Sequence, residues 1–324
     1  GGILMLAFFI TKKMNFYIIG GLGHIGSYLI RNLPKFFPKS NFIIIDNLST
    51  QKYSSLFNLN KKYKYKFIYS DIKDLNLQKI LKKEDIVIHL AALTNAWESF
   101  KIPKIYKKKN FGNTKFIVEA CLKKKSNLIF MSSTSVYNTK NKFISEDCQK
   151  KELKPDSPYS KIKLEEENLI KINSKKFNLN YLILRLGTIA GTSPGMQFHT
   201  AVNKFCLQAV QGIPLSLWKN FRLISKPYLD LKDLNLALVF LIKNKINKET
   251  LNLVTNNMTT IELIKIIKKF LPKIKIISKN KNGLKPNSFI VNNEKISKLK
   301  FKFKGNIKNR ISDTISLLRN SNNI

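Results

Sequence analysis

A cluster of glycines directly after a short apolar run constrains the fold of this chain most. Residues 16–26 read FYIIGGLGHIG, and apolar residues then recur at a helical spacing as far as residue 33. A strand, a tight glycine turn and a helix N-terminus together present backbone N–H groups and a positive dipole end to a pyrophosphate. The segment therefore predicts a dinucleotide-binding unit. A glycine-rich turn in some other α/β domain is the alternative.

The glycines fit two registers of the dinucleotide pattern. Gly21, Gly23 and Gly26 match GxGxxG, whereas Gly20, Gly23 and Gly26 match GxxGxxG. Asp46 ends the next apolar run, about 20 residues on, where a carboxylate can accept hydrogen bonds from both hydroxyls of a ribose. The same carboxylate would repel a 2′-phosphate, so the pattern favours NAD over NADP.

Short β-type runs alternate with helical stretches in the first half of the chain. The expected strands are 15–19, 41–45, 65–69, 86–90, 127–132 and 181–186, and the expected helices are 24–33, 74–83, 98–124 and 159–176. This alternation predicts an α/β fold with a Rossmann-type, doubly wound parallel sheet. From residue 187 the pattern changes, and further helices are expected at 200–211, 231–243 and 260–270.

These patterns divide the chain into an expected NAD-binding Rossmann domain, 14–187, and a smaller C-terminal substrate-binding lobe, 188–324. Within the second part, residues 228–241 could return to the Rossmann domain. Residues 1–13 form an N-terminal extension of doubtful structure, and Met14 is the expected natural start. The alternative for the extension is a weak signal or membrane-surface segment, although its apolar run is too short to span a bilayer.

The strong positive charge has a compositional explanation. The formal net charge is +38, but only five of the 58 basic residues are Arg, and the lysines are spread along the whole chain. Proteins that read bases and phosphates rely on the bidentate fork of Arg. We therefore expect a solvated lysine surface and no specific nucleic-acid partner. A charge this large still predicts weak, salt-sensitive binding to polyanions.

The remaining composition favours a cytoplasmic protein without a metal site. The three cysteines are far apart and the three histidines do not cluster, so neither a zinc site nor a disulfide framework is expected. No apolar run reaches the length of about 18 residues that a transmembrane helix needs.

A Tyr-x-x-x-Lys pair suggests the chemistry. Tyr159 and Lys163 lie one helical turn apart, so both side chains share a face of the predicted helix. A lysine ammonium beside a phenol lowers the pKa of the phenol toward that of a usable general base. Two other pairs begin at Tyr69 and Tyr228, but only Tyr159 opens a helical segment and follows a serine cluster, 132–135, that closes a strand.

These features occur in the order of a known family. They are GGLGHIG (20–26), DNLS (46–49), SDIKD (70–74), VIHLAA (87–92), SSTSVY (132–137), PYSKIK (158–163), LRLGT (184–188) and PYLDLKDL (227–234). The chain resembles the extended short-chain dehydrogenases/reductases of the NAD-dependent sugar-nucleotide epimerase/dehydratase family. The resemblance spans Met14 to about Leu241 and continues less specifically in 252–257 and 295–305.

The resemblance implies roles for individual residues. Ser133 takes the place of the catalytic Ser/Thr, Tyr159 that of the base and Lys163 that of its partner. The implied cofactor contacts are Gly20, Gly23, His24, Ile25, Gly26, Asp46, Asn47, Asp71, Ile72, Leu90, Ala91, Ala92, Tyr159 and Lys163. Candidate substrate contacts are Thr94, Ser133, Thr188, His199, Thr200, Asn203, Arg222 and Lys226. The chain departs from the family pattern at Lys226, nearest the place of an Arg, and at Thr188, where many relatives have Asn.

The implied reaction is a reversible transfer of a hydride between the sugar and NAD⁺. Tyr159 as phenolate removes the proton of a sugar hydroxyl, at C4, and the C4 hydride passes to NAD⁺ and returns to the other face of a 4-keto sugar. A 4,6-dehydratase of this family carries an Asp-Glu pair directly after the catalytic hydroxyl, because water loss needs its own acid and base. Here those places hold Thr134 and Ser135. We therefore expect NAD-dependent epimerisation of a UDP-hexose for surface polysaccharide biosynthesis.

Two alternatives stay open at this point. The first is a net NAD(P)-dependent sugar-nucleotide reductase or dehydratase. The second is a non-catalytic family member that binds RNA or polyanions through its positive charge. Beyond the nucleotide-sugar substrate, the resemblance leaves open a homodimer formed through the four-helix contact that is usual in the family.

Overall fold

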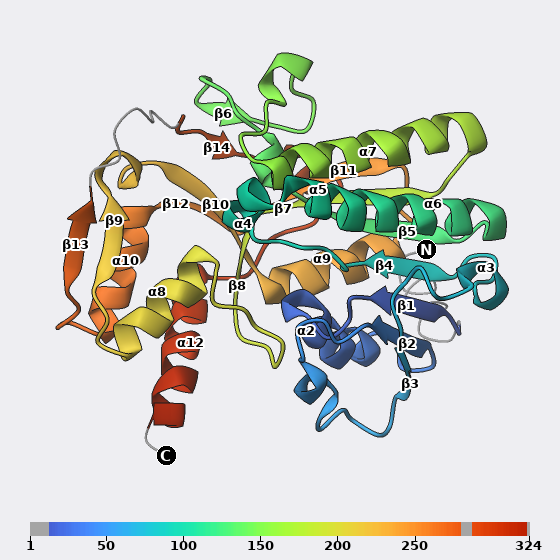
Figure 1. Ribbon diagram of the computed structural model, residues 1–324, viewed down its shortest axis with the longest axis horizontal. Helices are drawn as coiled ribbons and strands as arrows, with labels where there is room; N and C mark the ends of the chain where they lie inside the picture. Colours follow the sequence, from blue (N-terminus) through green and yellow to red (C-terminus); the bar gives the residue numbers. More distant parts are fainter. Residues whose placement is uncertain (1–12, 280–286, 323–324) are drawn as a thin grey trace.

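A seven-stranded parallel sheet forms the centre of the larger lobe (Figure 1). The computed structural model describes residues 13–279 and 287–322. The strands of the sheet are β1 (Asn15–Ile19), β2 (Asn41–Asp46), β3 (Lys64–Tyr69), β4 (Ile86–His89), β5 (Asn127–Ser133), β7 (Tyr181–Leu186) and β11 (Glu249–Leu253), in the order β11-β7-β5-β4-β1-β2-β3. The order reverses between β1 and β4, and α/β proteins bind ligands at the carboxyl ends of strands at such a switch point.

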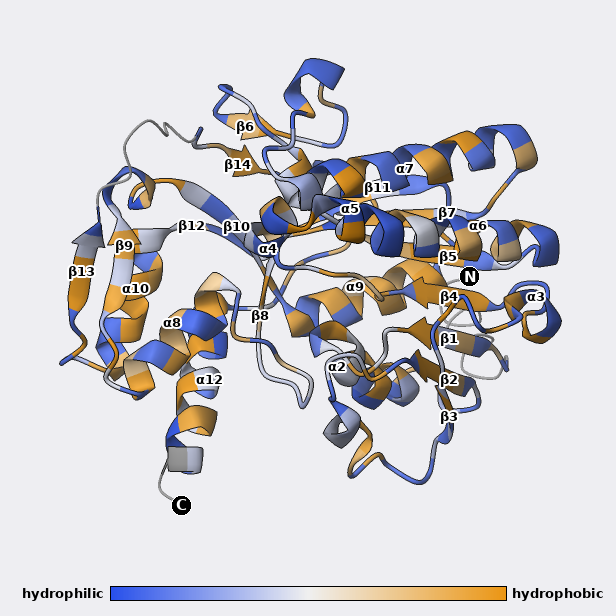
Figure 2. Ribbon diagram, viewed as in Figure 1, coloured by the Kyte–Doolittle hydropathy of each residue, from blue (hydrophilic) through white to orange (hydrophobic). Residues whose placement is uncertain are grey.

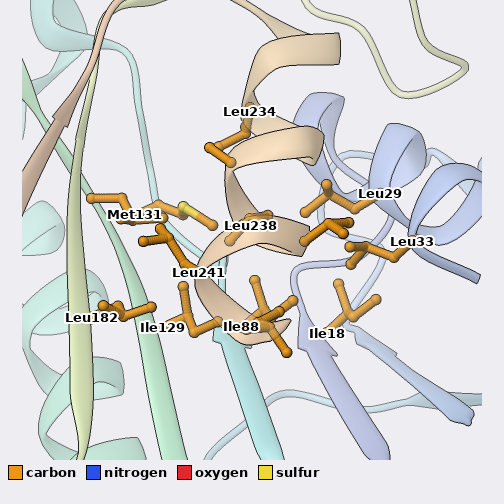
Figure 3. Close-up of a cluster of buried hydrophobic side chains, with 14 of the residues drawn as sticks. Ile18, Leu29, Leu33, Ile88, Ile129, Met131, Leu182, Leu234, Leu238 and Leu241 are labelled. Atoms are coloured by element: carbon orange, nitrogen blue, oxygen red, sulfur yellow. The ribbon is translucent and has the colours of Figure 1, made fainter. Parts of the chain in front are cut away.

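Helices cover both faces of this sheet because successive strand residues point to opposite sides. On one face, Ile18, Ile88 and Ile129 pack in one cluster with helices α2 (His24–Asn32) and α9 (Leu231–Lys243). Figure 3 shows side chains of these two helices meeting those of the strands. On the other face, Ile19 and Phe130 pack with helices α6 (Gly112–Lys124) and α7 (Pro158–Phe177). The inner strands β1, β2 and β4 are accordingly apolar along most of their length (Figure 2).

A smaller lobe lies beside the carboxyl ends of these strands (Figure 1). A three-stranded sheet consists of β8 (Thr188–Ala190), β10 (Ser225–Asp230) and β12 (Asn256–Thr259). There are also two separate parallel pairs. One consists of β9 (Leu215–Trp218) and β13 (Ile276–Lys279), and the other of β6 (Phe143–Ile144) and β14 (Ile290–Val291). Helices α8 (Ala201–Val210), α10 (Thr260–Phe270) and α12 (Ile307–Asn322) contribute to a separate apolar cluster there. Helix α11 (Glu294–Lys298) packs instead through Ile296 on the cluster of the large sheet.

The expected strands of the large sheet and the α/β class are confirmed, but two expected helices are wrong in extent. The stretch 98–124 divides into α4 (Ala96–Lys101), α5 (Pro103–Tyr106), a π-helical turn over 107–111 and α6. Pro103 explains the first break, because its missing N–H cannot continue the preceding helix. The stretch 74–83 holds a single turn, α3 (Leu77–Ile80), and α12 was not foreseen.

The division into domains stays a prediction, but the structure shows where the chain returns to the large sheet. Strand β11 pairs with β7, with Leu251 opposite Leu184, and α9 buries its apolar face in the same cluster. The returning stretch thus extends beyond 228–241 to residue 253. The expectations for residues 1–13 fall outside the described residues, apart from residue 13 itself.

Residues 13–279 and 287–322 lack two kinds of feature. No helix there is both long and apolar enough to cross a membrane. No group of three or more His, Cys, Asp or Glu side chains there could hold a metal ion.

The position of α9 predicts a large effect of core truncation. Leu238 is fully buried against the sheet, so Leu238→Ala should lower the free energy of unfolding by about 2–5 kcal/mol. Leu223→Ala is the control, because that side chain is 73% exposed and its loss should cost at most about 0.5 kcal/mol. Urea denaturation measures both, and equal effects would contradict the packing described here.

Candidate active site

A cavity of about 1680 Å³ opens where the carboxyl ends of the parallel strands face the smaller lobe. The expected residues that line it are Gly20, Gly23, His24, Ile25, Gly26, Asn47, Asp71, Leu90, Ala91, Ala92, Thr94, Ser133, Tyr159, Lys163, Thr188, His199, Thr200 and Lys226. The fold therefore brings most of the residues expected from the sequence to one place, although they come from distant segments of the chain.

The glycine turn after β1 fits a ligand that approaches its backbone. Gly20 has a φ of +79°, and a Cβ there would lie 2.6 Å from the backbone N of Ala91. A Cβ on Gly26 would lie 2.5 Å from Gly21 O, so neither position tolerates a side chain. At Gly23 a Cβ would meet only Gly20 O, at 3.5 Å, and would fill space that is open to the cavity. The three glycines of the GxxGxxG register therefore line the cavity, whereas Gly21 packs against Ile44.

Asp46 ties the end of β2 to the glycine turn. Its carboxylate accepts hydrogen bonds from the backbone N–H of Leu22, at 3.1 Å, and of Leu48, at 2.9 Å. Nearby, Asn47 Nδ2 donates to Asp71 Oδ2 at 3.0 Å. Asp46 and Ile72 do not line the main cavity but a hollow of about 50 Å³ beside it, which they share with Asn47 and Asp71. The expected ribose and adenine contacts are thus neighbours.

The loop after β4 is held by a residue that the sequence analysis did not single out. Asn110 Oδ1 accepts from Leu93 N at 2.8 Å, and Asn110 Nδ2 donates to Leu93 O at 3.0 Å. This pair of bonds fixes the backbone next to Ala91 and Ala92, which face the glycine turn. Asn110 is buried in the π-helical turn before α6, a feature without a clear sequence signal.

A segment of the smaller lobe, residues 191–196, rests on the glycine turn. His24 Nε2 donates to Gly191 O at 2.7 Å, and Gly195 N donates to Ser27 Oγ at 2.9 Å. Lys52 Nζ donates to Gly195 O at 2.6 Å. A Cβ on Gly195 would lie 2.1 Å from Leu22 O, so the 191–196 segment touches the turn backbone to backbone. The contact anchors the segment just before Gln197 and His199, which line the cavity.

Helix α7 begins at the cavity with a defined cap. Ser157 Oγ accepts from Ser160 N at 3.1 Å, and Pro158 occupies the first turn, where its missing N–H costs nothing. A chain of hydroxyls then runs from Ser157 through Ser160 and Ser135 to Ser133, with oxygens 2.9, 2.7 and 2.8 Å apart. This chain links the start of α7, which carries Tyr159, to the end of β5.

The ammonium of Lys163 is buried and paired. Its Nζ lies 3.2 Å from Glu166 Oε2 and 4.4 Å from the centre of the Phe130 ring. That Lys163 lowers the pKa of Tyr159 stays a prediction. Burial raises the pKa of Tyr159, and Glu166 and Tyr106 raise it further.

A second buried ion pair fixes α7 to the sheet. Arg185 of β7 forms two parallel hydrogen bonds with Glu167, from Nε to Oε1 at 2.9 Å and from Nη2 to Oε2 at 2.6 Å. Burial alone would raise the pKa of Glu167, but the guanidinium of Arg185 and the ammonium of Lys171 hold it below its ordinary value. Tyr137 extends the network, because its hydroxyl accepts from Arg185 and donates to Asn252.

The expected substrate contacts divide into two groups. Thr94, Thr188, His199, Thr200 and Lys226 line the cavity, and Thr94 Oγ1 lies 3.5 Å from His199 Nε2. Asn203 and Arg222 do not line it. Asn203 is buried in α8 and donates to Gln197 O, and Arg222 is exposed after β9. The sequence spacing did not show which way either segment faces.

Further polar residues reach the cavity without having been foreseen. Asn287 Nδ2 donates to Asn138 Oδ1 at 2.7 Å, and Asn138 Nδ2 donates to Asp156 Oδ1 at 2.8 Å. All three residues line the cavity. Asn287 stands almost 150 residues after Asn138 in the chain, so no local pattern could have joined them.

The sequence matches the model of the NAD dependent epimerase/dehydratase family over residues 16–253. The chain therefore belongs to this family of enzymes that share a dinucleotide-binding fold.

Among curated proteins, the chain is 34% identical over 188 residues to a dTDP-D-glucose 4,6-dehydratase of Dictyostelium discoideum, an alignment that covers 54% of this chain and 43% of that protein. It is 30% identical over 216 residues to an uncharacterized UDP-glucose epimerase of Bacillus subtilis, covering 63% of this chain and 65% of the relative. The chain thus spans less than two thirds of either relative.

A solved structure agrees over nearly the whole chain. The UDP-glucuronic acid 4-epimerase of Bacillus cereus, in complex with UDP-glucuronic acid and NAD, superposes with a TM-score of 0.83 at 25% identity. The match covers 95% of this chain and 100% of that one.

The 191–196 segment predicts a cofactor effect at a distance from the cofactor motif. Gly195→Ala should push the segment off the glycine turn at a cost of about 1–3 kcal/mol, and should weaken NAD binding by about tenfold. Titration calorimetry with NAD measures the affinity. Thr192→Ala, in the same segment, is the control and should bind NAD as the wild type does. Equal affinities for both variants would contradict a role of this contact in NAD binding.

Proposed function

We propose that this protein epimerises a UDP-hexose at C4 with NAD as its cofactor. The observation that carries the proposal is that Ser133, Tyr159 and Lys163 line the same cavity as the glycine turn. A hydroxyl, a phenol and an ammonium are the groups that a proton transfer at a sugar hydroxyl requires. The names of the relatives support the substrate class, since one is a UDP-glucose epimerase and one was solved with a UDP-sugar and NAD.

The residues present fit NAD in this cavity. Gly20, Gly23 and Gly26 would face the pyrophosphate, and the open space at Gly23 would admit it. Asp46 keeps free lone pairs beside its two backbone contacts and would hold the adenosine ribose, with Asn47 near it. Asp71 and Ile72 would flank the adenine, Leu90, Ala91 and Ala92 would line the middle of the cofactor, and His24 and Ile25 would stand at the turn.

The protein's own side chains would accept and return the proton of the sugar 4-hydroxyl. When bound, NAD would supply the acceptor and donor of the hydride. Tyr159 Oη would take the proton of the sugar 4-hydroxyl and return it, while Ser133 Oγ would hydrogen-bond the same sugar oxygen. The Lys163 ammonium would stabilise the phenolate form of Tyr159. The 191–196 segment would hold the glycine turn in place beside the cavity.

The residues after Ser133 favour epimerisation over dehydration. Thr134 Oγ1 donates to Leu186 O at 3.1 Å and is buried, and Ser135 Oγ bonds to Ser133 and Ser160. Neither side chain is a carboxyl that could act as the separate acid and base of water loss. The similarity to a dehydratase therefore reflects the shared fold and cofactor site, in our proposal, rather than a shared second step.

The substrate contacts, the pathway, the compartment and the oligomeric state are also proposals. We propose a nucleotide-sugar substrate contacted by Thr94, Thr188, His199, Thr200 and Lys226, and a place in surface polysaccharide synthesis in the cytoplasm. The three cysteines, which are free, fit a reducing compartment. A homodimer would cover exposed apolar side chains on α4 and α7, among them Trp97, Phe100 and Ile172.

The direct test is NMR of the products formed from UDP-glucose, UDP-N-acetylglucosamine and their uronates. We expect the 4-epimer without net consumption of nicotinamide cofactor. Tyr159→Phe should lower kcat by about 10²–10⁴-fold, because the proton of the 4-hydroxyl loses its acceptor. Tyr69→Phe removes the hydroxyl from another Tyr-x-x-x-Lys pair, on an exposed side chain, and should leave kcat unchanged.

Two results would contradict the proposal. A 4-keto-6-deoxy product would identify a dehydratase, and strict dependence on stoichiometric NADH or NADPH would identify a reductase. If no sugar nucleotide is converted and polyanion binding survives raised salt, the non-catalytic alternative gains support instead.

A further inference from the structure

A buried carboxylate lies directly beneath the proposed catalytic pair. Glu166 follows Lys163 by three residues on α7 and is fully buried, with Oε2 3.2 Å from Lys163 Nζ. Within the described residues, Oε2 has no hydrogen-bond partner besides this ion-pair contact. The proposed function gives Glu166 no role, yet a buried charge is costly unless it is paired.

A cation and a hydrogen-bond donor surround the carboxyl of Glu166. Thr114 of α6 donates its only hydroxyl proton to Glu166 Oε1 at 2.5 Å. The contact of 2.9 Å between Thr114 Oγ1 and His89 Nε2 must therefore be donated by the imidazole. Burial lowers the pKa of His89 to about 3, so the ring is neutral and its Nδ1 carries no proton. The hydrogen bonds thus run from His89 through Thr114 to the carboxyl of Glu166.

We propose that Glu166 is a positioning residue that places a fixed negative charge under Lys163 and thereby sets the pH range in which Tyr159 and Lys163 act. The charge has two consequences. It pairs with the buried ammonium of Lys163, and it offsets the field of that ammonium at Tyr159. Both consequences raise the pH at which a proton leaves the pair, since a negative charge favours the protonated form of every neighbouring group.

Other ionisable groups face the pair from the surrounding elements. They are Tyr106 of α5, Glu98 of α4, whose carboxylate accepts from Tyr106 Oη at 2.8 Å, and His89 of β4. His89 is neutral, and Glu98 reaches Tyr159 only through Tyr106. The charge in direct contact with Lys163 is therefore that of Glu166, and its removal should dominate the change.

The test is the pH dependence of kcat in Glu166→Gln, which keeps the shape and the acceptor for Thr114 but removes the charge. The acid and the alkaline limbs should both move to lower pH, by about one pH unit. Glu165→Gln is the matched control. That neighbour has the same charge, but its side chain is 44% exposed and pairs with Lys107, at 3.0 Å, so the limbs of this variant should stay in place. A residue that only supported packing would lower kcat without moving either limb.

A second variant and a second readout keep the test decisive. Glu166→Asp retains the charge but withdraws it from Lys163, so its limbs should move in the same direction by less than those of Glu166→Gln.

Because the inference rests on the proposed function, tyrosinate absorbance is also titrated as the difference between each protein and its Tyr159→Phe counterpart, which needs no turnover. Tyr159 should ionise at lower pH in Glu166→Gln. Unchanged limbs and an unchanged titration in both variants would overturn the proposal, whereas a shifted titration without activity would overturn only the epimerase assignment.

Discussion

The buried ion pair between Arg185 and Glu167 is the interaction on which the rest of the site depends. It joins α7 to β7 through two parallel hydrogen bonds, in a place where neither side chain reaches solvent. Such pairs contribute little net stability but are expensive to break singly, so they define one arrangement of the elements they join. Here that arrangement places the first two turns of α7, which carry Tyr159 and Lys163, at the end of β5.

Two neighbouring acids on α7 therefore serve different purposes. Glu167 holds α7 against the sheet, because its carboxylate accepts hydrogen bonds from Arg185 and Ser132. Glu166, one residue earlier, faces Lys163 and Thr114 and belongs to the electrostatics of the site. Their separation explains how a chain with only 20 acidic residues places a negative charge beside a buried lysine without weakening the anchor of the helix.

The larger fold and the cavity walls were predictable from the sequence for local reasons. Apolar runs fixed the strands of the sheet, and positions that permit no Cβ explain why Gly20 and Gly26 marked the cofactor turn. The place of Ser133, Tyr159 and Lys163 followed from a strand end and a helix start. Long-range pairing was not predictable. Asn287 meets Asn138 across the smaller lobe, and the chain from His89 through Thr114 to Glu166 joins β4, α6 and α7. Asn203, a candidate substrate contact, does not line the cavity, because helical spacing alone does not show which face of α8 is buried.

Our central proposal is that a hydride would leave C4 of a sugar nucleotide for NAD and return to C4 within one site. The most direct measurement uses UDP-glucose deuterated at C4, or the corresponding label on whichever UDP-hexose is converted, with NMR and mass analysis of the product. The account predicts a 4-epimer that retains the deuterium at C4 without exchange into solvent or into another sugar nucleotide. Loss of the label to water, or its appearance at C6, would contradict it.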